Sequence, residues 1–575
     1  MSEPAPARRV VAGNGTTRTP QGRLLRAMVL IVIGMLVTVG SASSDAYLHR
    51  GATVDSNIIY QQPAGAALAT NVDLRNLTAN ALQSEIGILR EAGYQFLRQP
   101  VYWSDVEKTP GKFDWSIYSP IFDSIAASHL TPVLVLQGTP YWARYPTQVD
   151  ALDAPPFSMT LLDRFCQQLM TVAPTARFFQ IGANLDDPDY WGHHHVSAFT
   201  YANMLQAASH GLNIAGIDGI LISGEIGANP TLRETGEDLA TIRRLFVNPD
   251  IRGQVRVLAV SIDGGNTSPY DRNASARTDN LSRAVLVREA IDDTGALTLP
   301  VWFTHLGWGG DGGSVSANRQ GQFVAAGIRR VRDEWPWVGL VFNWAYGNGE
   351  PMAAEANLPL VVNGQQTPLM DAMIRFGKSI IGSSMSNGFS PPDSSACTYN
   401  GNWQAQHLRE GQYRLARDPG STVTCRFWGT GFSTVFRFSP DAGTARYVVD
   451  RSTLPAVGTG TDVGNVFLTY RVENAFEQPV ELVSGLPEGY HTITIGLADN
   501  HEVVIGGYLV ERERPMIWPI AVLVAAGIVA MFLGLRTIAY LAAEMVGMID
   551  TRPHDPTQTA LPTLTEWNPM PRFRR

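Results

Sequence analysis

Two long runs of uncharged, apolar residues, one near each end of the chain, constrain its fold more than any other feature. The second run, Pro515 to Leu535, contains 21 residues without a charge, which is enough to cross the hydrocarbon core of a bilayer. The first run, residues 27–44, follows a basic N-terminal segment, residues 1–26, that carries five arginines. Because positively charged flanks stay on the cytoplasmic side, we expect two transmembrane helices that hold the intervening domains outside the cytoplasm.

The sequence leaves open whether the first apolar segment is cleaved off or stays in the mature protein. This segment closes on Gly40-Ser41-Ala42, which a signal peptidase could cleave. The long basic segment before it favours an uncleaved signal anchor, with a removed signal peptide as the alternative. For the second run the alternative is a buried core helix. The expected location is the cell membrane, crossed twice, with the N-terminus and the tail 536–575 both cytoplasmic.

Composition narrows the possible partners. A chain of 575 residues is too long for one ordinary domain, and its 45% hydrophobic content suffices to bury a core. A net charge of −8 argues against a nucleic-acid partner, which usually requires a basic face.

The three cysteines of the chain cannot form a disulfide framework. Cys397 and Cys425 flank one predicted β region and could pair in an oxidising exterior. Cys166 is expected to be a buried thiol.

Residues 45–382 show short apolar runs that alternate with longer amphipathic stretches, such as 81–92, 157–172 and 199–210. Strands that alternate with helices predict parallel βαβ units, and a segment of this length suits an eight-fold (β/α)8 barrel. The seven candidate strands are Tyr94–Val101, Pro132–Leu136, Arg177–Ile181, Gly219–Ser223, Val255–Ile262, Pro300–Thr304 and Val338–Phe342.

Several segments at the ends of these strands carry a family resemblance. They are Trp103-Ser104-Asp105-Val106-Glu107 with Pro110–Trp115, then Gly138–Ala143, Gly307-Trp308 and Leu358–Leu369. They resemble the retaining glycoside hydrolases of the β-xylosidase and cellulase clan. The resemblance implies a barrel whose cleft binds sugars between aromatic side chains, and a catalytic pair of glutamates at the ends of the fourth and seventh strands.

The two positions that should carry those glutamates hold other residues. Pro188 and Trp191 set the alignment after the fourth strand and place Asn184 at the acid/base position, while Gly307-Trp308 places His305 at the nucleophile position. An amide cannot deliver a proton to a leaving oxygen, and losing general acid catalysis alone costs about 10²–10⁴ in rate. These substitutions predict a barrel that has kept its architecture and lost hydrolysis.

Other carboxylates could substitute for the missing pair. Asp186 and Asp187 follow the acid/base position, Glu225 ends the fifth strand and Asp263 ends the sixth. The alternative roles are turn residues for the first two, since Asx side chains commonly bond to the backbone, and a surface acid for Glu225. The resemblance also implies a position for an arginine near the nucleophile, occupied by Arg98. Its counter-ion would then be Asp263 or an anionic ligand, unless it forms an ordinary structural salt bridge.

Candidate substrate-binding side chains are Arg98, Asp186, Asp187, Asp263 and several tryptophans, and no metal ligands are expected. Adjacent residues such as His193-His194-His195 rarely all face one ion, so we expect a polar loop there, with no metal and no cofactor. Aromatic side chains at strand ends could stack on a sugar ring or pack in the core, and they are Trp103, Trp142, Trp191, Trp308 and Trp344.

A Gly-, Ser- and Pro-rich segment, residues 383–394, is expected to be a linker. Residues 395–512 then show short strands separated by Gly, Pro and Asp turns, which predicts an antiparallel, jelly-roll-like β-sandwich. Gly429-Thr430-Gly431, Val448-Val449-Asp450 and Gly489–Ile495 look like the carbohydrate-binding kind of jelly-roll module. Glu502 to Val510 is expected to return the chain to the membrane.

Three functions remain open at this point. The first is a membrane-anchored, catalytically degenerate glycosidase-like protein that binds or organises surface glycans or acts as a scaffold. The second is an active glycoside hydrolase with a relocated carboxylate pair that acts on cell-surface polysaccharide. The third is an extracytoplasmic subunit of a membrane-protein assembly.

Overall fold

The computed structural model describes residues 20–48, 50–51, 68–214, 219–309, 315–346, 360–362, 365–380, 384–385, 387–408, 411–450, 465–470, 475–512 and 518–546. The chain divides into two compact units. One holds the two terminal helices, and the other, His49–Pro515, holds the barrel and the β-rich segment.

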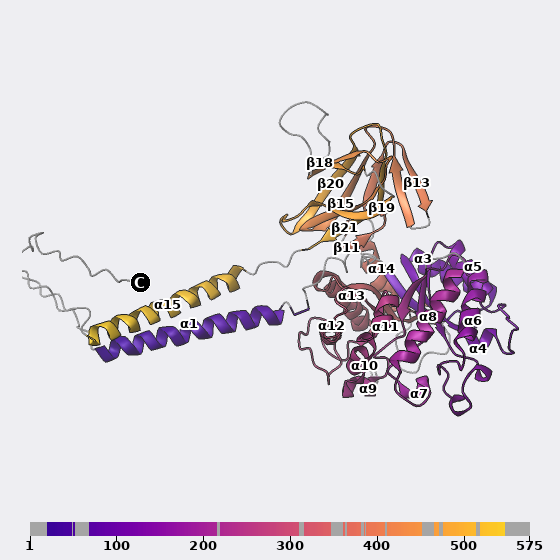
Figure 1. Cartoon of the computed structure of the whole chain (residues 1–575), viewed down its shortest axis with the longest axis horizontal. Helices are drawn as coiled ribbons and strands as arrows, with labels where there is room; N and C mark the ends of the chain where they lie inside the picture. The colour runs from indigo at the N-terminus through magenta and orange to yellow at the C-terminus, as the bar shows by residue number, and fades with distance from the viewer. Residues whose placement is uncertain are drawn as a thin grey trace, which may run out of the picture. The chain divides into compact units, whose positions relative to one another are not determined.

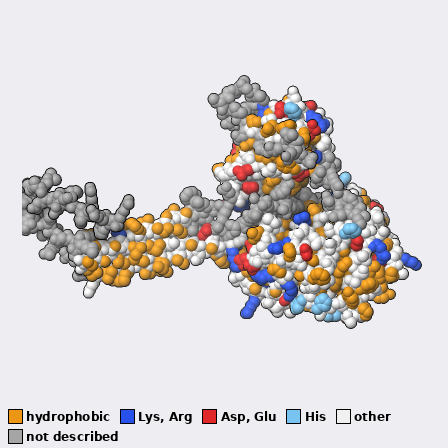
Figure 2. All heavy atoms as spheres, in the orientation of Figure 1, with side chains coloured by type: hydrophobic (Ala, Val, Ile, Leu, Met, Phe, Trp, Pro, Cys, Tyr) orange, Lys and Arg blue, Asp and Glu red, His pale blue; other side chains and the backbone are white. Residues whose placement is uncertain are grey.

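The terminal helices, α1 (Pro20–Leu48) and α15 (Trp518–Met545), pack side by side along their length (Figure 1). Arg23 lies 3.9 Å from Glu544, so the helices run antiparallel. Glycines allow the close approach: a Cβ atom on Gly34 would lie 2.5 Å from the carbonyl oxygen of Gly527. Their surfaces are almost wholly hydrophobic (Figure 2), and both helices are long and apolar enough to cross a membrane.

Eight parallel strands form the barrel. In hydrogen-bonded order they run β5-β4-β3-β2-β1-β8-β7-β6, and two parallel bridges, Ile222 to Val257 and Ile226 to Val260, join β5 to the β6 segment and close the ring. The strands are β1 (Leu68–Val72), β2 (Tyr94–Tyr102), β3 (Thr131–Gln137), β4 (Phe178–Ile181), β5 (Ile220–Ser223), β6 (Leu258–Asp263), β7 (Val301–Gly307) and β8 (Val338–Tyr346). The predicted (β/α)8 barrel is confirmed, with β1 as the strand that the apolar pattern missed.

Helices follow the strands and cover the barrel from outside (Figure 1). They are α3 (Ala79–Glu91), α4 (Trp103–Val106), α5 (Ser119–Ala127), α6 (Met159–Val172), α7 (Pro188–Trp191), α8 (Ala198–Ile214), α9 (Pro230–Thr235), α10 (Glu237–Phe246), α11 (Pro249–Gln254), α12 (Arg283–Asp292), α13 (Ala317–Glu334) and α14 (Pro368–Ile380).

Three of the short helices begin in the same way, with an Asx side chain followed by proline. Asp187, Asn229 and Asn248 each accept a hydrogen bond from the backbone N–H two residues ahead, and the proline at the first helical position has no N–H to leave unpaired. The local role predicted for Asp187 is therefore confirmed.

The other described sheets of this unit are antiparallel: a two-stranded sheet of β9 (Val361–Val362) and β10 (Gln365–Gln366), and two larger sheets. The first of the larger sheets has the order β13-β14-β21-β16-β19, with β11 paired to β21, and the second has the order β12-β15-β20-β17-β18. Side chains from both sheets share one core, in which Phe427 and Ile493 of the second sheet meet Phe432 and Ile505 of the first. The strands are β11 (Gly388–Ser390), β12 (Cys397–Asn400), β13 (Trp403–Leu408), β14 (Gly411–Ala416), β15 (Thr422–Gly429), β16 (Gly431–Phe438), β17 (Thr444–Val449), β18 (Asn465–Leu468), β19 (Phe476–Val483), β20 (Gly489–Leu497) and β21 (Val503–Glu511).

One boundary differs from the sequence-based expectation. β11 lies inside the predicted linker 383–394 and pairs with Tyr508–Val510, so this part of the linker belongs to a sheet. The difference arises because strand pairing over more than 100 residues leaves no local signal in the sequence. The segment Glu502 to Val510 includes most of β21, an inner strand that pairs with β14 and β16 and precedes α15 in the chain.

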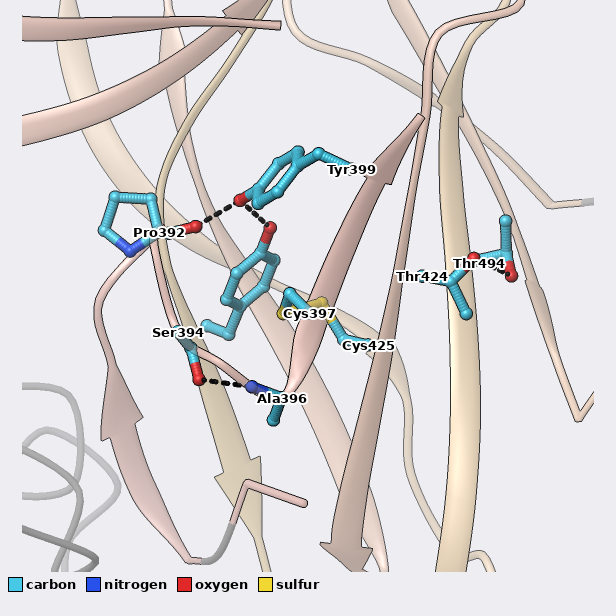
Figure 3. Close-up of a disulfide and its surroundings, with 9 residues drawn as sticks. Pro392, Ser394, Ala396, Cys397, Tyr399, Thr424, Cys425 and Thr494 are labelled. Atoms are coloured by element: carbon cyan, nitrogen blue, oxygen red, sulfur yellow. Dashed lines mark hydrogen bonds between the residues drawn. A yellow bond between two sulfur atoms is a disulfide. The ribbon is translucent and has the colours of Figure 1, made fainter. Parts of the chain in front are cut away.

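A disulfide joins Cys397 of β12 to Cys425 of β15, which are directly opposed in the ladder (Figure 3). Beside it, the hydroxyl group of Tyr399 hydrogen-bonds to the carbonyl oxygen of Pro392 and lies 2.7 Å from the hydroxyl group of Tyr508. Cys166 is a free, buried thiol on α6.

Replacing both Cys397 and Cys425 by serine should lower the free energy of unfolding of the sandwich by about 3 kcal/mol, because the bond closes a loop of 28 residues in the unfolded chain. A thiol titration of the denatured wild-type protein checks the pairing. It should detect one thiol without reductant and three after reduction, and three thiols without reductant would contradict the disulfide.

Candidate functional site

The interior of the barrel changes from apolar to polar along its strands. Ala69, Phe96, Phe178 and Trp302 contribute to an apolar cluster inside the barrel. Because strand side chains repeat with a period of two, the residues two positions later face the same interior, nearer the carboxyl ends of the strands. Those residues are polar and form one connected network: Asn71, Arg98, Gln180 and Thr304.

Arg98 is at the centre of this network. Its guanidinium group donates to Asn71 Oδ1, to Gln180 Oε1 and to Glu225 Oε2, each at 2.9 Å. Asn71 in turn donates to the carbonyl oxygens of Thr304 and Asn343. Arg98 therefore has a counter-ion, and it is Glu225 rather than Asp263 or a ligand.

Glu225 follows β5 and is buried, with only 1% of its surface exposed, so the alternative role of a surface acid is wrong. Besides Arg98, it accepts a hydrogen bond from the Thr304 hydroxyl at 2.8 Å, and its Oε1 contacts Nδ1 of His305. Burial alone would raise the pKa of this carboxyl, but the charges of His305 and Arg98 and the hydrogen bonds from His305 and Thr304 lower it to about 2. Glu225 is therefore ionised near neutral pH, and both of its carboxylate oxygens already have hydrogen-bond partners.

A β-bulge in β7 explains why two consecutive side chains reach the same carboxylate. Val260 of β6 pairs with Phe303, but the next residue, Ser261, pairs with His305, so Thr304 is an extra residue in the ladder. The bulge overrides the alternation that would send Thr304 and His305 to opposite faces. His305, at the predicted nucleophile position, is 3% exposed and holds Glu225 in place.

Asn184, at the predicted acid/base position, lies just beyond β4. Its φ of 32° is positive, a backbone conformation that asparagine tolerates better than most residues. The side chain is 8% exposed, and its Oδ1 atom is buried without a hydrogen-bond partner among the described residues. An amide in this position can accept a hydrogen bond from a hydroxyl group but cannot act as a general acid.

The two aspartates after Asn184 are buried as well. Asp186 Oδ2 accepts a hydrogen bond from the Gly227 backbone, while its buried Oδ1 has no partner among the described residues. Burial is the main cause that raises the pKa of Asp186 from 3.8 to about 7; the charges of Asp238 and Asp187 act in the same direction, and the hydrogen bond from the Gly227 backbone acts against them. Asp187 caps α7 and accepts from Asn229.

Asp263, the other candidate anion, lies at the end of β6. It accepts a hydrogen bond from the Gly265 backbone and lies 3.5 Å from Arg233, a different guanidinium group from that of Arg98.

Most of the candidate tryptophans pack in the core. Trp103, Trp191 and Trp308 are each at most 2% exposed, and Trp103 stacks on Phe165 with ring centroids 5.2 Å apart. Their ring faces are therefore not available to a sugar in this structure. Trp142 is half-buried and donates to the carbonyl oxygen of Glu107. The side chain of Trp344 lies outside the described residues.

The three consecutive histidines face three different partners. His193 contacts Asp150 at 3.0 Å, His194 contacts Gln148, and His195 lies 3.1 Å from Glu237. Within the described part of the chain, no group of three His, Cys, Asp or Glu side chains is arranged to hold a metal ion.

Comparisons with known proteins give architectural likeness only. No family model and no curated protein matches the chain. Solved structures similar to it include a family 39 glycoside hydrolase from Bacteroides cellulosilyticus WH2 (13% identity, 79% of this chain and 82% of that chain, TM-score 0.43). Others are a glucosidase from Croceicoccus marinus (11%, 77% and 98%, 0.41) and a family 30 endoxylanase from Clostridium papyrosolvens C71 (13%, 76% and 97%, 0.36). Such low identities and TM-scores assign the chain to no family, so its chemistry has to be judged from its own side chains.

Proposed function

We propose that this chain is a membrane-anchored, extracytoplasmic protein whose barrel binds glycans without hydrolysing them. The observation that carries the proposal is the state of Glu225. This carboxylate is 1% exposed, and its two oxygens are occupied by Arg98, Thr304 and His305.

The proposal follows from what retaining hydrolysis requires. A retaining glycosidase needs an accessible carboxylate nucleophile about 5 Å from a second carboxyl group that donates a proton. Burial keeps Glu225 from attacking a sugar, and its pKa of about 2 keeps it from donating a proton. Asn184 and His305 at the expected catalytic positions supply neither group.

The two apolar helices supply the membrane anchor. Their close packing through Gly34 and Gly527 supports an uncleaved first helix, because a removed signal peptide would leave α15 without this partner. The basic segment before α1 favours a cytoplasmic N-terminus, and the Cys397–Cys425 disulfide suits an oxidising exterior.

The experiment is a hydrolysis assay of the full-length protein in detergent on a panel of activated aryl glycosides. We expect release no faster than the buffer background, because activated aryl groups leave without a general acid but still require an accessible carboxylate nucleophile, and Glu225 is buried. A retaining β-xylosidase on the same panel controls for substrate quality. Turnover by the wild-type protein would refute the non-hydrolytic proposal.

Asp186 gives one specific reason to keep the relocated carboxylate pair as a second candidate. Its pKa of about 7 suits a general acid at neutral pH, although the side chain is 2% exposed and would have to become accessible to donate its proton. Turnover that is abolished by Asp186→Asn would support this candidate. Absence of both turnover and glycan binding, with co-purification of membrane proteins, would instead favour the assembly subunit.

A further inference from the structure

We propose that neutral glycans bind to an exposed aromatic surface on the loops that follow β3 and β4. This surface, called the tyrosine platform below, consists of Tyr141, Tyr145, Phe157 and Tyr190. The inference rests on the proposed function and assigns it to a place on the barrel other than the central network.

The four rings of the tyrosine platform are unusually exposed. Tyr141 is 69% exposed, Phe157 50%, Tyr145 49% and Tyr190 40%. Exposed apolar groups are a common feature of binding surfaces, and among these four the rings of Tyr145 and Phe157 contact each other. By contrast, Trp103, Trp191 and Trp308 at neighbouring strand ends are buried.

Backbone hydrogen bonds join the segments of the two loops that carry these rings. The N–H group of Phe157 donates to the carbonyl oxygen of Ala143 at 2.9 Å, and the ring centroids of Tyr145 and Phe157 are 6.5 Å apart. The N–H group of Asp153 donates to the carbonyl oxygen of Tyr190 at 3.2 Å, which joins the loop after β3 to the loop after β4.

Two buried charged residues fix the shape of the loop after β3. The Arg144 guanidinium group donates to the carbonyl oxygens of Thr139 and Val149, and the carboxyl group of Asp153 accepts from the Gly138 backbone at 2.7 Å. A loop that is bonded internally in this way keeps its rings in place before a ligand arrives, which reduces the entropy lost on binding.

The surroundings of the rings favour a neutral glycan. In this fold, ligand sites lie on the loops at the carboxyl ends of the strands, which is where both loops lie. Gln148, whose backbone N–H group donates to the carbonyl oxygen of Tyr145 at 2.9 Å, adds a polar side chain to the same loop. The exposed carboxylates of Asp150 and Asp189 would repel a polyanion. Rings with polar neighbours suit the alternating C–H and hydroxyl faces of a neutral sugar.

The test is affinity electrophoresis of the full-length protein in detergent, in gels that contain xylan, glucomannan or a neutral β-glucan, with polygalacturonate as the anionic probe. We expect retardation by at least one neutral polymer. The double variant Tyr141→Ala, Tyr145→Ala should bind at least about tenfold more weakly than the wild type. The double variant Tyr141→Phe, Tyr145→Phe should retain binding because the rings remain. Leu297→Ala, an exposed apolar residue on the loop between α12 and β7, is the matched control and should not change binding.

The outcomes separate this inference from the proposed function. If the wild-type protein binds none of the polymers, glycan binding itself fails. If the wild type binds and the alanine double variant binds equally well, the platform is wrong while glycan binding stands. Trp428 and Tyr490 lie in the β-sandwich with their ring centroids 4.5 Å apart. Loss of binding in the double variant Trp428→Ala, Tyr490→Ala would place the glycan site there and overturn the platform. Retardation by polygalacturonate alone would overturn the neutral ligand.

Discussion

Glu225→Gln should lower the free energy of unfolding of the barrel by about 3–5 kcal/mol, because it leaves Arg98 as an uncompensated charge in the interior. Arg98 and Glu225 side chains are only 8% and 1% exposed, so water cannot replace the lost partner. Chemical denaturation followed by tryptophan fluorescence measures the change, since nine of the 13 tryptophans lie between residues 103 and 344.

Glu289→Gln is the matched control for this substitution. Glu289 pairs with Arg50 on the surface, where the two side chains are 45% and 39% exposed, and the same chemical change there should cost less than about 1 kcal/mol. Arg98→Met combined with Glu225→Gln should be less destabilising than the sum of the two single changes, because the two residues form one pair. Equal effects of Glu225→Gln and Glu289→Gln would show that the central network does not stabilise the barrel.

The stability of the barrel should fall by up to about 4 kcal/mol as the pH rises from about 4 to about 7, through Asp186. Burial raises the pKa of this group from 3.8 to about 7, so the folded state holds a proton that the unfolded chain has already released. Glu225 acts in the opposite direction. Its pKa is lowered from 4.5 to about 2, so its contribution is complete above about pH 4.5 and is lost as the pH falls toward 2. With respect to these two groups, the barrel should be most stable near pH 4 to 5.

Asp186→Asn should reduce the fall in stability between pH 4 and 7 without removing it, because burial also raises the pKa of Asp153, to about 6. The amide oxygen can still accept the hydrogen bond from the Gly227 backbone, but the group no longer titrates. Asp189→Asn is the control, since the Asp189 side chain is 89% exposed and its removal should leave the pH profile unchanged. Thermal unfolding midpoints from pH 4 to pH 8 test the idea, and identical profiles for the wild type and Asp186→Asn would contradict it.

Local patterns in the sequence determined the parts of this protein that depend on neighbouring residues. Uncharged runs predicted α1 and α15, and the alternation of apolar segments with amphipathic stretches predicted seven of the eight barrel strands. The resemblance to the glycoside hydrolases pointed to Asn184, Arg98 and His305, and the end of the fifth predicted strand pointed to Glu225. The polar network could also have been noticed in this way, since Asn71, Gln180 and Thr304 each follow an apolar interior residue by two positions.

Only the tertiary structure decided how those residues are combined. Arg98 and Glu225 are 127 residues apart in the chain, and Glu225 and His305 are 80 apart. The bulge in β7 that turns both Thr304 and His305 toward Glu225 is likewise a property of strand pairing. The same holds for the burial of Asp186 and for the exposure of the tyrosine platform beside buried tryptophans. Each of these features depends on which side chains meet after the barrel closes, and hydrophobic periodicity carries no information about such long-range contacts.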